Sequence, residues 1–420
     1  MPDLFHLILQ AAVILAAARA VGFLFAKINQ PQVMGEMVAG ILLGPSLLGW
    51  LAPGVSAALF PPASVGYLNA LSQVGLVVFM FVVGLALDPT ELRGYGHTAV
   101  LIGHVSIVAP FFLGGVTALY LYPRLSDDAV TFMGFALFMG SAMSITAFPV
   151  LARILDERGL VRSRMGALAI ACAAVNDITG WCILAYIVVV VRVTHAARPV
   201  WVTVGGSLAY VLVMVFGVRR FLPAFERAYR RHGRLSDNLI AAILVLLLAS
   251  ALVTEWLGVQ LLFGAFLMGA IMPKTQEFTR YLLHKFESVV VVLLLPLFFA
   301  CSGLRTHIGV GGNRAIWLYS AIVIVAAVAG KLGGSAIAAR VSGMPWRDSA
   351  ALGVLMNTRG LMELVILNLG LDIGVISPAL FSIMVLMALV TTFMTTPLLE
   401  WVYPARLLKA QTNEVHENVA

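Results

Sequence analysis

The sequence predicts an all-α polytopic membrane protein with about thirteen transmembrane helices in one membrane domain. The chain of 420 residues is 61% hydrophobic and only 11% charged, whereas soluble domains are about a quarter charged. Apolar runs of about 20 residues, the length that crosses a bilayer as a helix, recur from end to end. Their residues do not alternate in polarity as the strands of a membrane barrel do. We therefore expect a transmembrane domain over residues 1–402 and a short cytoplasmic tail over 403–420.

Each predicted span is a mainly apolar segment. The spans cover residues 4–26, 33–52, 65–87, 96–122, 129–152, 165–192, 200–218, 237–256, 259–273, 286–304, 315–340, 348–371 and 376–402. Asp3 and the lack of a nearby Lys or Arg favour a retained first span over a cleaved signal peptide. Alternate loops carry 19 and 5 Lys and Arg residues. The richer side is expected to be cytoplasmic, so the N-terminus lies outside and the C-terminus inside the cell membrane.

The net charge of +7 follows from this loop bias and does not indicate nucleic-acid binding. The three cysteines, Cys172, Cys182 and Cys301, lack metal-ligand spacing, so we expect buried apolar side chains there. The polar groups near the membrane midplane include no nucleophile–base pair and no metal cluster. The chain therefore predicts a transporter without a cofactor rather than an enzyme.

Asp177 is the residue most out of place in its surroundings. It lies in a span from Met165 to Arg192, roughly 18 Å and 22 Å from the two ends at 1.5 Å per residue. A carboxylate near the midplane costs about 2.5–3.5 kcal/mol on insertion scales, so such residues usually have a function. A proton or a small cation can each neutralise it, which makes Asp177 the predicted exchange site.

Two spans contain residues that interrupt a helix. The fifth is rich in hydroxyl groups and ends at Pro149, which removes a backbone donor and clashes with the preceding turn. The twelfth has Arg359 and Gly360 at its middle. Interruptions seven spans apart predict an inverted repeat, with approximate repeats 1–192 and 237–402 and a linker helix 200–218, whose two discontinuous helices cross at the midplane. Pro149 alone is equally compatible with a packing kink.

Lys331 is the third polar residue of the predicted membrane core. It lies roughly 15 Å from the nearer helix end, beyond the reach of a snorkelling side chain. It must therefore be paired, neutral or in contact with water, and Asp177 or the negative ends of the broken helices are the expected partners. Arg359 and Glu363, four residues apart on one helix face, would neutralise each other. A purely structural role for that pair is as plausible as a functional one.

Four motifs resemble those of the monovalent cation:proton antiporter superfamily. They are Val175-Asn-Asp-Ile-Thr-Gly-Trp181, Gly330-Lys-Leu-Gly-Gly334, Asn357-Thr-Arg-Gly-Leu-Met-Glu-Leu364 and Gly35-Glu-Met-Val-Ala-Gly-Ile-Leu-Leu-Gly-Pro45. The order of the motifs over nearly the whole chain is similar to the second group of that superfamily. This group includes plant cation/proton exchangers and bacterial glutathione-gated potassium efflux systems.

The resemblance implies a core domain that carries the crossed helices and moves against a dimerising scaffold in an elevator-like motion. It places the cation and proton site on Asp177, Asn176 and Thr146, with Lys331 as the basic partner. Asn-Asp relatives are associated with electroneutral exchange and often have arginine as the basic residue. This chain combines Asn-Asp with lysine, and one-for-one exchange is expected. Ser144, Arg359 and Glu363 are expected to support the site.

The residues themselves predict competition at one carboxylate. Burial disfavours the charged form of Asp177 while Lys331 favours it, so a proton and a hard cation that prefers oxygen ligands can alternate there. The principal alternative is the membrane part of a gated K⁺ efflux system with a separate regulatory subunit. An organic-anion symporter and a sensor that has lost transport are weaker alternatives. The residue types do not distinguish Na⁺ from K⁺.

Overall fold

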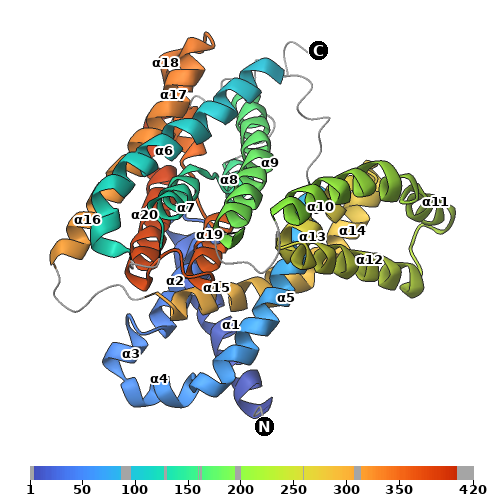
Figure 1. Cartoon of the computed structure of the whole chain (residues 1–420), viewed down its shortest axis with the longest axis horizontal. Helices are drawn as coiled ribbons and strands as arrows, with labels where there is room; N and C mark the ends of the chain where they lie inside the picture. The colour runs from blue at the N-terminus through green and yellow to red at the C-terminus, as the bar shows by residue number, and fades with distance from the viewer. Residues whose placement is uncertain are drawn as a thin grey trace. The chain divides into compact units, whose positions relative to one another are not determined.

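The computed structural model describes residues 4–86, 96–126, 130–158, 160, 163–193, 200–258, 260–306 and 314–403. The predicted tail from residue 404 onward lies outside the described residues, as do Arg93, Arg162, Arg198, Arg406 and Lys409, which contribute to the orientation prediction. The described chain is helical, with no β-strand among its assigned elements (Figure 1).

The α-helices follow one another along the chain with these bounds: α1 (Leu4–Lys27), α2 (Gln32–Leu43), α3 (Leu48–Leu51), α4 (Pro53–Leu59), α5 (Pro62–Ala86), α6 (Gly96–Leu125), α7 (Phe132–Ser144), α8 (Phe148–Glu157), α9 (Arg164–Val193), α10 (Val200–Leu212), α11 (Pro223–His232), α12 (Asp237–Trp256), α13 (Leu261–Ile271), α14 (Gln276–Val289), α15 (Leu295–Leu304), α16 (Arg314–Val328), α17 (Gly334–Val341), α18 (Trp346–Met356), α19 (Leu361–Asp372) and α20 (Pro378–Val402). The described residues also include the π-helical segments η2 (Val213–Gly217), η4 (Val290–Leu294) and η5 (Ala329–Gly333) and the 3₁₀ turn η3 (Val218–Arg220).

Ten helices of the described residues are long and apolar enough to cross a membrane. This confirms the prediction of a multi-pass helical membrane protein. The other three expected spans correspond to the short helix α13 and to two interrupted helices, α7 with α8 and α18 with α19. The total of thirteen membrane crossings stays a prediction.

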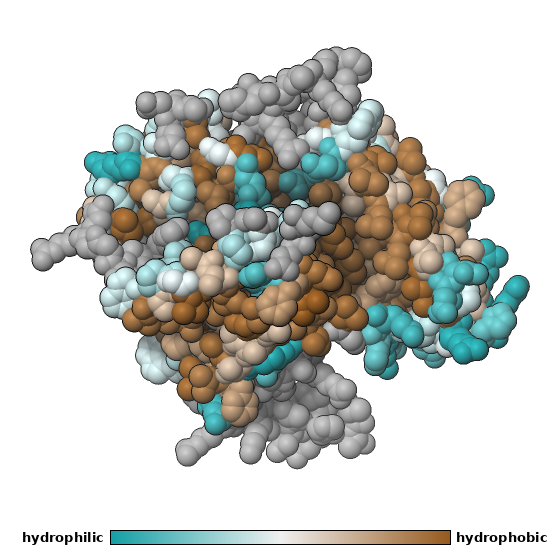
Figure 2. Space-filling model, turned by 90° about the horizontal axis from the view of Figure 1, so that it is seen from below, coloured by the Kyte–Doolittle hydropathy of each residue, from teal (hydrophilic) through white to brown (hydrophobic). Residues whose placement is uncertain are grey.

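The described residues expose more apolar surface than is usual for a water-soluble protein. Figure 2 shows brown, hydrophobic residues over broad areas of the visible face. Large apolar side chains are freely exposed, including Phe112 at 68%, Phe216 at 73% and Trp401 at 80%. Extended apolar surface of this kind marks a membrane or partner contact, and lipid tails provide that contact for spanning helices.

The chain divides into two compact units. Unit 1 comprises Met1–Leu15, Ala58–Thr90 and Ala185–Cys301, and unit 2 comprises Ala16–Ala57, Glu91–Leu184 and Ser302–Ala420. Every residue predicted for the ion site falls in unit 2. The predicted repeat boundaries at 192 and 237 and the linker helix remain a prediction.

Unit 1 contains a close helix crossing between α5 and α13. A Cβ atom on Gly84 would lie 2.1 Å from the Phe266 carbonyl oxygen, and one on Gly269 would lie 2.1 Å from the Phe81 carbonyl oxygen. Small residues let membrane helices approach to backbone contact in this way. Lys274 Nζ donates to the carbonyls of Gly84 (2.8 Å) and Gly269 (3.1 Å), and so satisfies backbone groups near the ends of both helices.

Unit 2 is built around α7, α8, α18 and α19, four half-length helices with α9 and η5 beside them. The buried apolar side chains of α8, α9, α17 and α18 form one cluster that includes Leu151, Leu168, Ala339 and Leu355. This cluster packs the half-helices without requiring lipid to fill the space between them. The polar groups at the broken helix ends are therefore enclosed by protein, the setting in which irregular backbone is tolerated at membrane depth.

The α5–α13 crossing generates a stability prediction. We expect Gly84→Ala to lower the free energy of unfolding by about 1–3 kcal/mol, because the added methyl group meets backbone and forces the helices apart. The matched control is Gly66→Ala on the same helix, since a Cβ there meets no atom within 4 Å. Thermal denaturation of the two purified variants in detergent checks this, and equal melting temperatures would contradict it.

Candidate functional site

The first helix interruption lies between Ser144 and Phe148. Helix α7 ends at Ser144, and Ile145 adopts an extended conformation before α8 begins at Phe148. The sequence analysis expected an interruption in this segment and attributed it to Pro149, whereas the break lies just before the proline. Pro149 is the second residue of α8, where the missing N–H has no partner to lose and the fixed φ suits a helix start. The proline therefore begins the second half-helix and does not kink a continuous one.

The second interruption lies between Met356 and Leu361, where α18 ends and α19 begins. Its four residues cross the first interruption directly. The backbone N–H of Ala147 donates to the carbonyl of Thr358 at 3.0 Å. The Thr146 hydroxyl donates to the carbonyl of Met356, the last residue of α18, at 2.9 Å. Each break thus satisfies backbone groups that the other leaves without an intrahelical partner.

Helix α20 also forms hydrogen bonds with the backbone of the second interruption. Thr392, on α20, accepts a hydrogen bond from the Arg359 N–H at 2.8 Å and donates to the Arg359 carbonyl at 2.9 Å. One hydroxyl therefore replaces both hydrogen bonds that the interrupted helix loses at this residue. Buried Thr391, Thr395 and Thr396 lie on the same helix.

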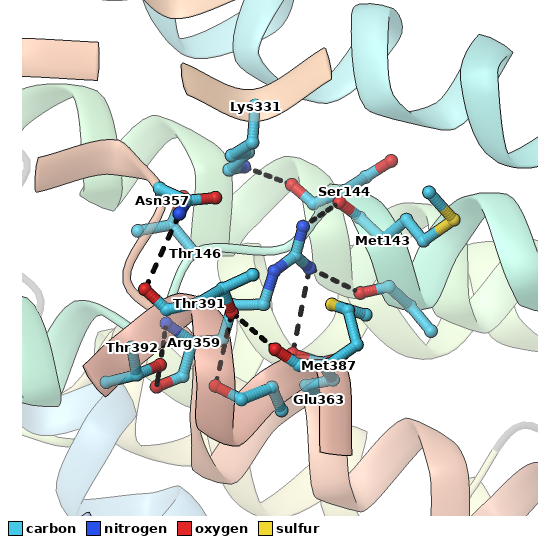
Figure 3. Close-up of polar contacts among 12 residues, drawn as sticks. Met143, Ser144, Thr146, Lys331, Asn357, Arg359, Glu363, Met387, Thr391 and Thr392 are labelled. Atoms are coloured by element: carbon cyan, nitrogen blue, oxygen red, sulfur yellow. Dashed lines mark hydrogen bonds and ion pairs between the residues drawn. The ribbon is translucent and has the colours of Figure 1, made fainter. Parts of the chain in front are cut away.

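Two buried cations hold the C-terminal end of α7. Arg359 donates from Nη1 to the Ala142 carbonyl at 2.8 Å and from Nη2 to the Met143 carbonyl, as Figure 3 shows. Lys331 Nζ donates to the Ser144 carbonyl. A helix C-terminus exposes carbonyls that lack partners and carries about half a negative charge. Three of the last carbonyls of α7 are therefore satisfied by positive side chains from two other segments.

Lys331 also reaches α6, through a carbonyl that a proline makes available. Its Nζ donates to the Ser106 carbonyl at 2.9 Å. In a regular helix the N–H of residue 110 would bond that carbonyl, but Pro110 has no N–H. The approach is close, because a Cβ on Gly330 would lie 2.6 Å from the Pro110 Cα. Lys331 lies within the π-helical segment η5, a local irregularity that often occurs at functional positions.

Asp177 is fully buried on α9. Its side chain is 0% exposed, and neither carboxylate oxygen has a hydrogen-bond partner among the described residues. Two groups favour its charged form: the positive charge of Lys331 and the backbone N–H of Phe148, the first residue of α8, which lies near the carboxylate without meeting strict hydrogen-bond geometry. Lys331 therefore acts on Asp177 through space, while its direct contacts are the carbonyls described above.

Asn176 joins three elements beside Asp177. Its Oδ1 accepts the N–H of Thr146 at 3.0 Å, and its Nδ2 donates to the Ser106 hydroxyl at 2.8 Å. The structure thus brings Asn176 and Thr146 together, as the sequence analysis expected of ion ligands. Both have structural hydrogen bonds here as well. The Ser144 hydroxyl turns back to the carbonyl of Gly140 at 2.5 Å, so only the Ser144 backbone contacts Lys331.

Arg359 and Glu363 form the pair expected from their spacing. Arg359 Nη1 lies 3.6 Å from Glu363 Oε2, and both side chains are almost fully buried. No hydrogen bond reaches either Glu363 oxygen from the residues described. The sequence analysis missed Ser106 and Thr392. Ser106 had a detectable signal, because it precedes Pro110 by four residues, whereas nothing in the sequence pairs Thr392 with the break.

The arrangement places buried oxygen-bearing side chains at and next to the crossing of the two breaks. Asp177, the Asn176 amide oxygen and the Thr146 hydroxyl oxygen offer the hard ligands that alkali cations prefer. A hydroxyl that donates one hydrogen bond keeps two acceptor lone pairs, and an amide oxygen that accepts one keeps another. The structural hydrogen bonds are therefore compatible with ion coordination.

Residues 12–401 match the family model described as "Sodium/hydrogen exchanger, transmembrane". The Na(+)/H(+) antiporter NhaS4 of Synechocystis is 45% identical over 94% of this chain and 96% of its own length. Cation/H(+) antiporter 17 of Arabidopsis thaliana is 40% identical over 94% of this chain, which spans only 48% of that relative. The sodium proton antiporter MjNhaP1 of Methanocaldococcus jannaschii has a similar fold, with a TM-score of 0.63 at 14% identity over 96% of this chain and 98% of its own.

The crossing predicts a measurable contribution from a single hydroxyl. Thr146→Val keeps the side-chain shape but leaves the Met356 carbonyl without its donor, and we expect a loss of about 1 kcal/mol of stability. Thr117→Val is the matched control, because that hydroxyl bonds only to Leu113 in its own helix. Thermal unfolding of both variants is the measurement. An equally small effect in each would show that the crossing does not depend on this bond.

Proposed function

This chain belongs to the sodium/hydrogen exchanger family, and we propose that it is a secondary active antiporter that exchanges a monovalent cation, Na⁺ or K⁺, for protons across a membrane. Its relatives are ion antiporters, not enzymes, and its fold is that of a sodium proton antiporter. The Na(+)/H(+)-K(+) antiporter GerN of Bacillus cereus, 26% identical over 96% of this chain, supports keeping both cations in the proposal.

The observation that supports this most is the state of Asp177. A fully buried carboxylate that has no close hydrogen-bond partner among the described residues is unfavourable unless a proton or a counter-ion accompanies it. Lys331 and Arg359 donate to backbone carbonyls, so neither forms a close ion pair with Asp177. A positive species from solution is therefore the natural partner of this carboxylate.

One carboxylate with two possible partners makes the loaded states mutually exclusive. A proton neutralises Asp177 without help, whereas a cation would also use the oxygens of Asn176 and Thr146. If the protein changes its accessible side only when Asp177 is neutralised, then each crossing moves either a proton or a cation. Exchange follows from that restriction, and one cation per proton is the stoichiometry expected from a single carboxylate.

The broken helices supply what such a site needs in hydrocarbon. Their freed backbone groups replace part of the ion's hydration shell, while Lys331 and Arg359 offset the negative end of α7. The residues proposed for the site all belong to unit 2, which supports the proposal of an elevator-type motion of this unit.

An inverted repeat, assembly as a homodimer and an N-out, C-in orientation in the cell membrane belong to the same proposal. A separate regulatory subunit, as in gated K⁺ efflux systems, is compatible with it.

The central test is Asp177→Asn, which keeps the shape and removes the charge. We expect cation-driven proton flux in proteoliposomes to fall to the level of empty vesicles. The amide does not bind and release a proton in this pH range, and it has no negative charge to neutralise a bound cation. Size-exclusion profiles and melting temperature should stay at or above those of the original protein, since a buried charge without hydrogen bonds has been removed. Retained exchange by the folded variant would refute the proposal.

Competition gives a second test, on the unmodified protein. In the acidic range, where Asp177 holds a proton before the cation binds, the apparent KM for the cation should rise about tenfold for each unit by which pH falls, as linkage requires for one proton released per cation bound. The maximal rate at saturating cation should change far less. Initial proton fluxes at several pH values, with Na⁺, K⁺, Li⁺ and Rb⁺ compared, provide the measurement. A KM independent of pH would exclude a shared carboxylate.

A further inference from the structure

Unit 1 contains an apolar groove that the exchange cycle described above does not use. Its lining comes from α10, η2, α12 and α13, and its volume is about 410 Å³, within the range of about 300–1,000 Å³ that is usual for ligand sites. Gly206 and Ala209 line it on α10, Ala249 and Val253 on α12, and Met268 on α13. The small residues at three of these positions leave space between α10 and α12.

The hydroxyl groups in the groove are already engaged. Ser250 Oγ donates its single hydrogen to the Gly264 carbonyl at 2.7 Å, so the Tyr210 hydroxyl must be the donor in its hydrogen bond with Ser250 Oγ. Neither hydroxyl keeps a hydrogen for a ligand, and the other lining residues are apolar. The groove is therefore suited to hydrocarbon rather than to a polar solute.

The groove follows the helices for about the depth of one membrane leaflet. At one end a Cβ on Gly206 would lie 2.5 Å from Leu257 Cδ2, and Val218, far along the same segment, also lines the groove. Residues 206–218 span roughly 18 Å at 1.5 Å per residue, and one leaflet contributes about 15 Å of hydrocarbon. Val213 and Val253 line the groove and are 60% and 42% exposed, so an acyl chain can enter from the lipid side.

Basic residues begin directly after Val218. Arg219 and Arg220 follow it, and both are exposed. Residues 219–237 contain six arginines and only two acids, Glu226 and Asp237. Glu226 pairs with Arg230 at 2.6 Å, whereas Arg219 and Arg220 form no ion pair within the described part of the chain. The end of the groove at Val218 is therefore next to an excess of positive charge.

Helix α11 keeps this basic segment folded against the rest of unit 1. The Tyr229 ring packs against those of Phe278 and Tyr281 on α14, with centroid distances of 5.7 Å and 4.9 Å. Leu222, which precedes the helix, is 1% exposed. Figure 1 shows α11 at one end of α10 and α12. The basic segment is thus part of the folded unit and not a free loop.

We propose that this groove binds an acyl chain of an anionic phospholipid whose phosphate group is bound by Arg219 and Arg220. A guanidinium forms strong, often bidentate, hydrogen bonds with phosphate oxygens, and the apolar lining accepts the chain. The segment supplies six of the 19 Lys and Arg residues that predict the cytoplasmic side, and the cytoplasmic leaflet is rich in anionic lipids. The inference is independent of the antiport proposal, because it involves no residue of the ion site.

The first experiment tests the headgroup. Native mass spectrometry of the full chain in detergent gives the apparent Kd of the first lipid bound, with dioleoylphosphatidylglycerol and dioleoylphosphatidylcholine as probes. We expect the anionic lipid to bind more tightly, and Arg219→Gln combined with Arg220→Gln to weaken its binding by on the order of tenfold.

The matched control is Arg231→Gln combined with Arg234→Gln, which removes the same charge near the far end of α11 and should weaken binding much less. Equal losses in the two double variants would indicate a diffuse attraction to the basic segment and would overturn the proposal. Equal affinity of the unmodified protein for the two lipids would overturn it as well.

The second experiment tests the groove. Ala249→Phe places a ring in the lining, and we expect it to weaken phosphatidylglycerol binding although the arginines are unchanged. Ala241→Phe is the matched control, because Ala241 is exposed on the same helix and is not a lining residue. Melting temperatures identify the folded variants. Unchanged lipid affinity in folded Ala249→Phe would contradict the proposal.

A second copy of this chain is the other occupant that an exposed apolar groove could accept, and the same spectra report the number of subunits. If Ala249→Phe changes that number while phosphatidylglycerol affinity stays the same, the groove is a subunit interface and the lipid proposal fails. If the number is kept and lipid affinity falls in Ala249→Phe and in the Arg219–Arg220 variant but not in the controls, the proposal is supported. Neither result bears on exchange at Asp177, which Asp177→Asn tests separately.

Discussion

The negative end of α7, held by two cations from other segments, is the constraint on which unit 2 depends. A helix that stops within the hydrocarbon leaves carbonyls that neither water nor a following turn can bond, at several kcal/mol each. Arg359 satisfies two of these carbonyls and Lys331 a third. The same contacts fix the crossing of the two broken helices, because Arg359 lies in the second break and reaches the end of the first.

The two basic residues are not interchangeable in this role. The planar guanidinium spans two successive carbonyls and faces Glu363 with the same group. The lysine ammonium is a point donor, and it bridges the end of α7 to the Ser106 carbonyl that Pro110 leaves open on α6. Lys331 thus connects η5, α6 and the end of α7. Because Gly330 has no side chain, η5 can lie close enough to α6 for the Lys331 ammonium to reach the Ser106 carbonyl.

This use of the cations has a consequence for Asp177. Because the Lys331 ammonium is directed at backbone carbonyls, its charge acts on Asp177 without a direct hydrogen bond, and no other close partner of that carboxylate occurs among the described residues. A tight Asp–Lys pair would satisfy the carboxylate permanently and leave little affinity for an ion. In the proposed exchange cycle, the loose arrangement would leave Asp177 able to bind a proton or a cation in turn.

The sequence by itself determined the class of protein, because the length and apolarity of each segment are local properties that lipid enforces. It also identified Asp177, Lys331 and Arg359, since a charge in an apolar run is conspicuous without any structure. It attributed the first helix break to Pro149, although the proline lies in the first turn of the helix that follows the break. A proline can disrupt a helix interior or start a helix, and which of the two occurs depends on where the preceding turn ends. Only the tertiary structure decided the partners. Thr392 and Ser106 contact the site from distant segments of the chain. Lys331 donates its hydrogen bonds to backbone carbonyls and not to Asp177. These contacts depend on how several helices pack together, which the residues of any single helix do not determine.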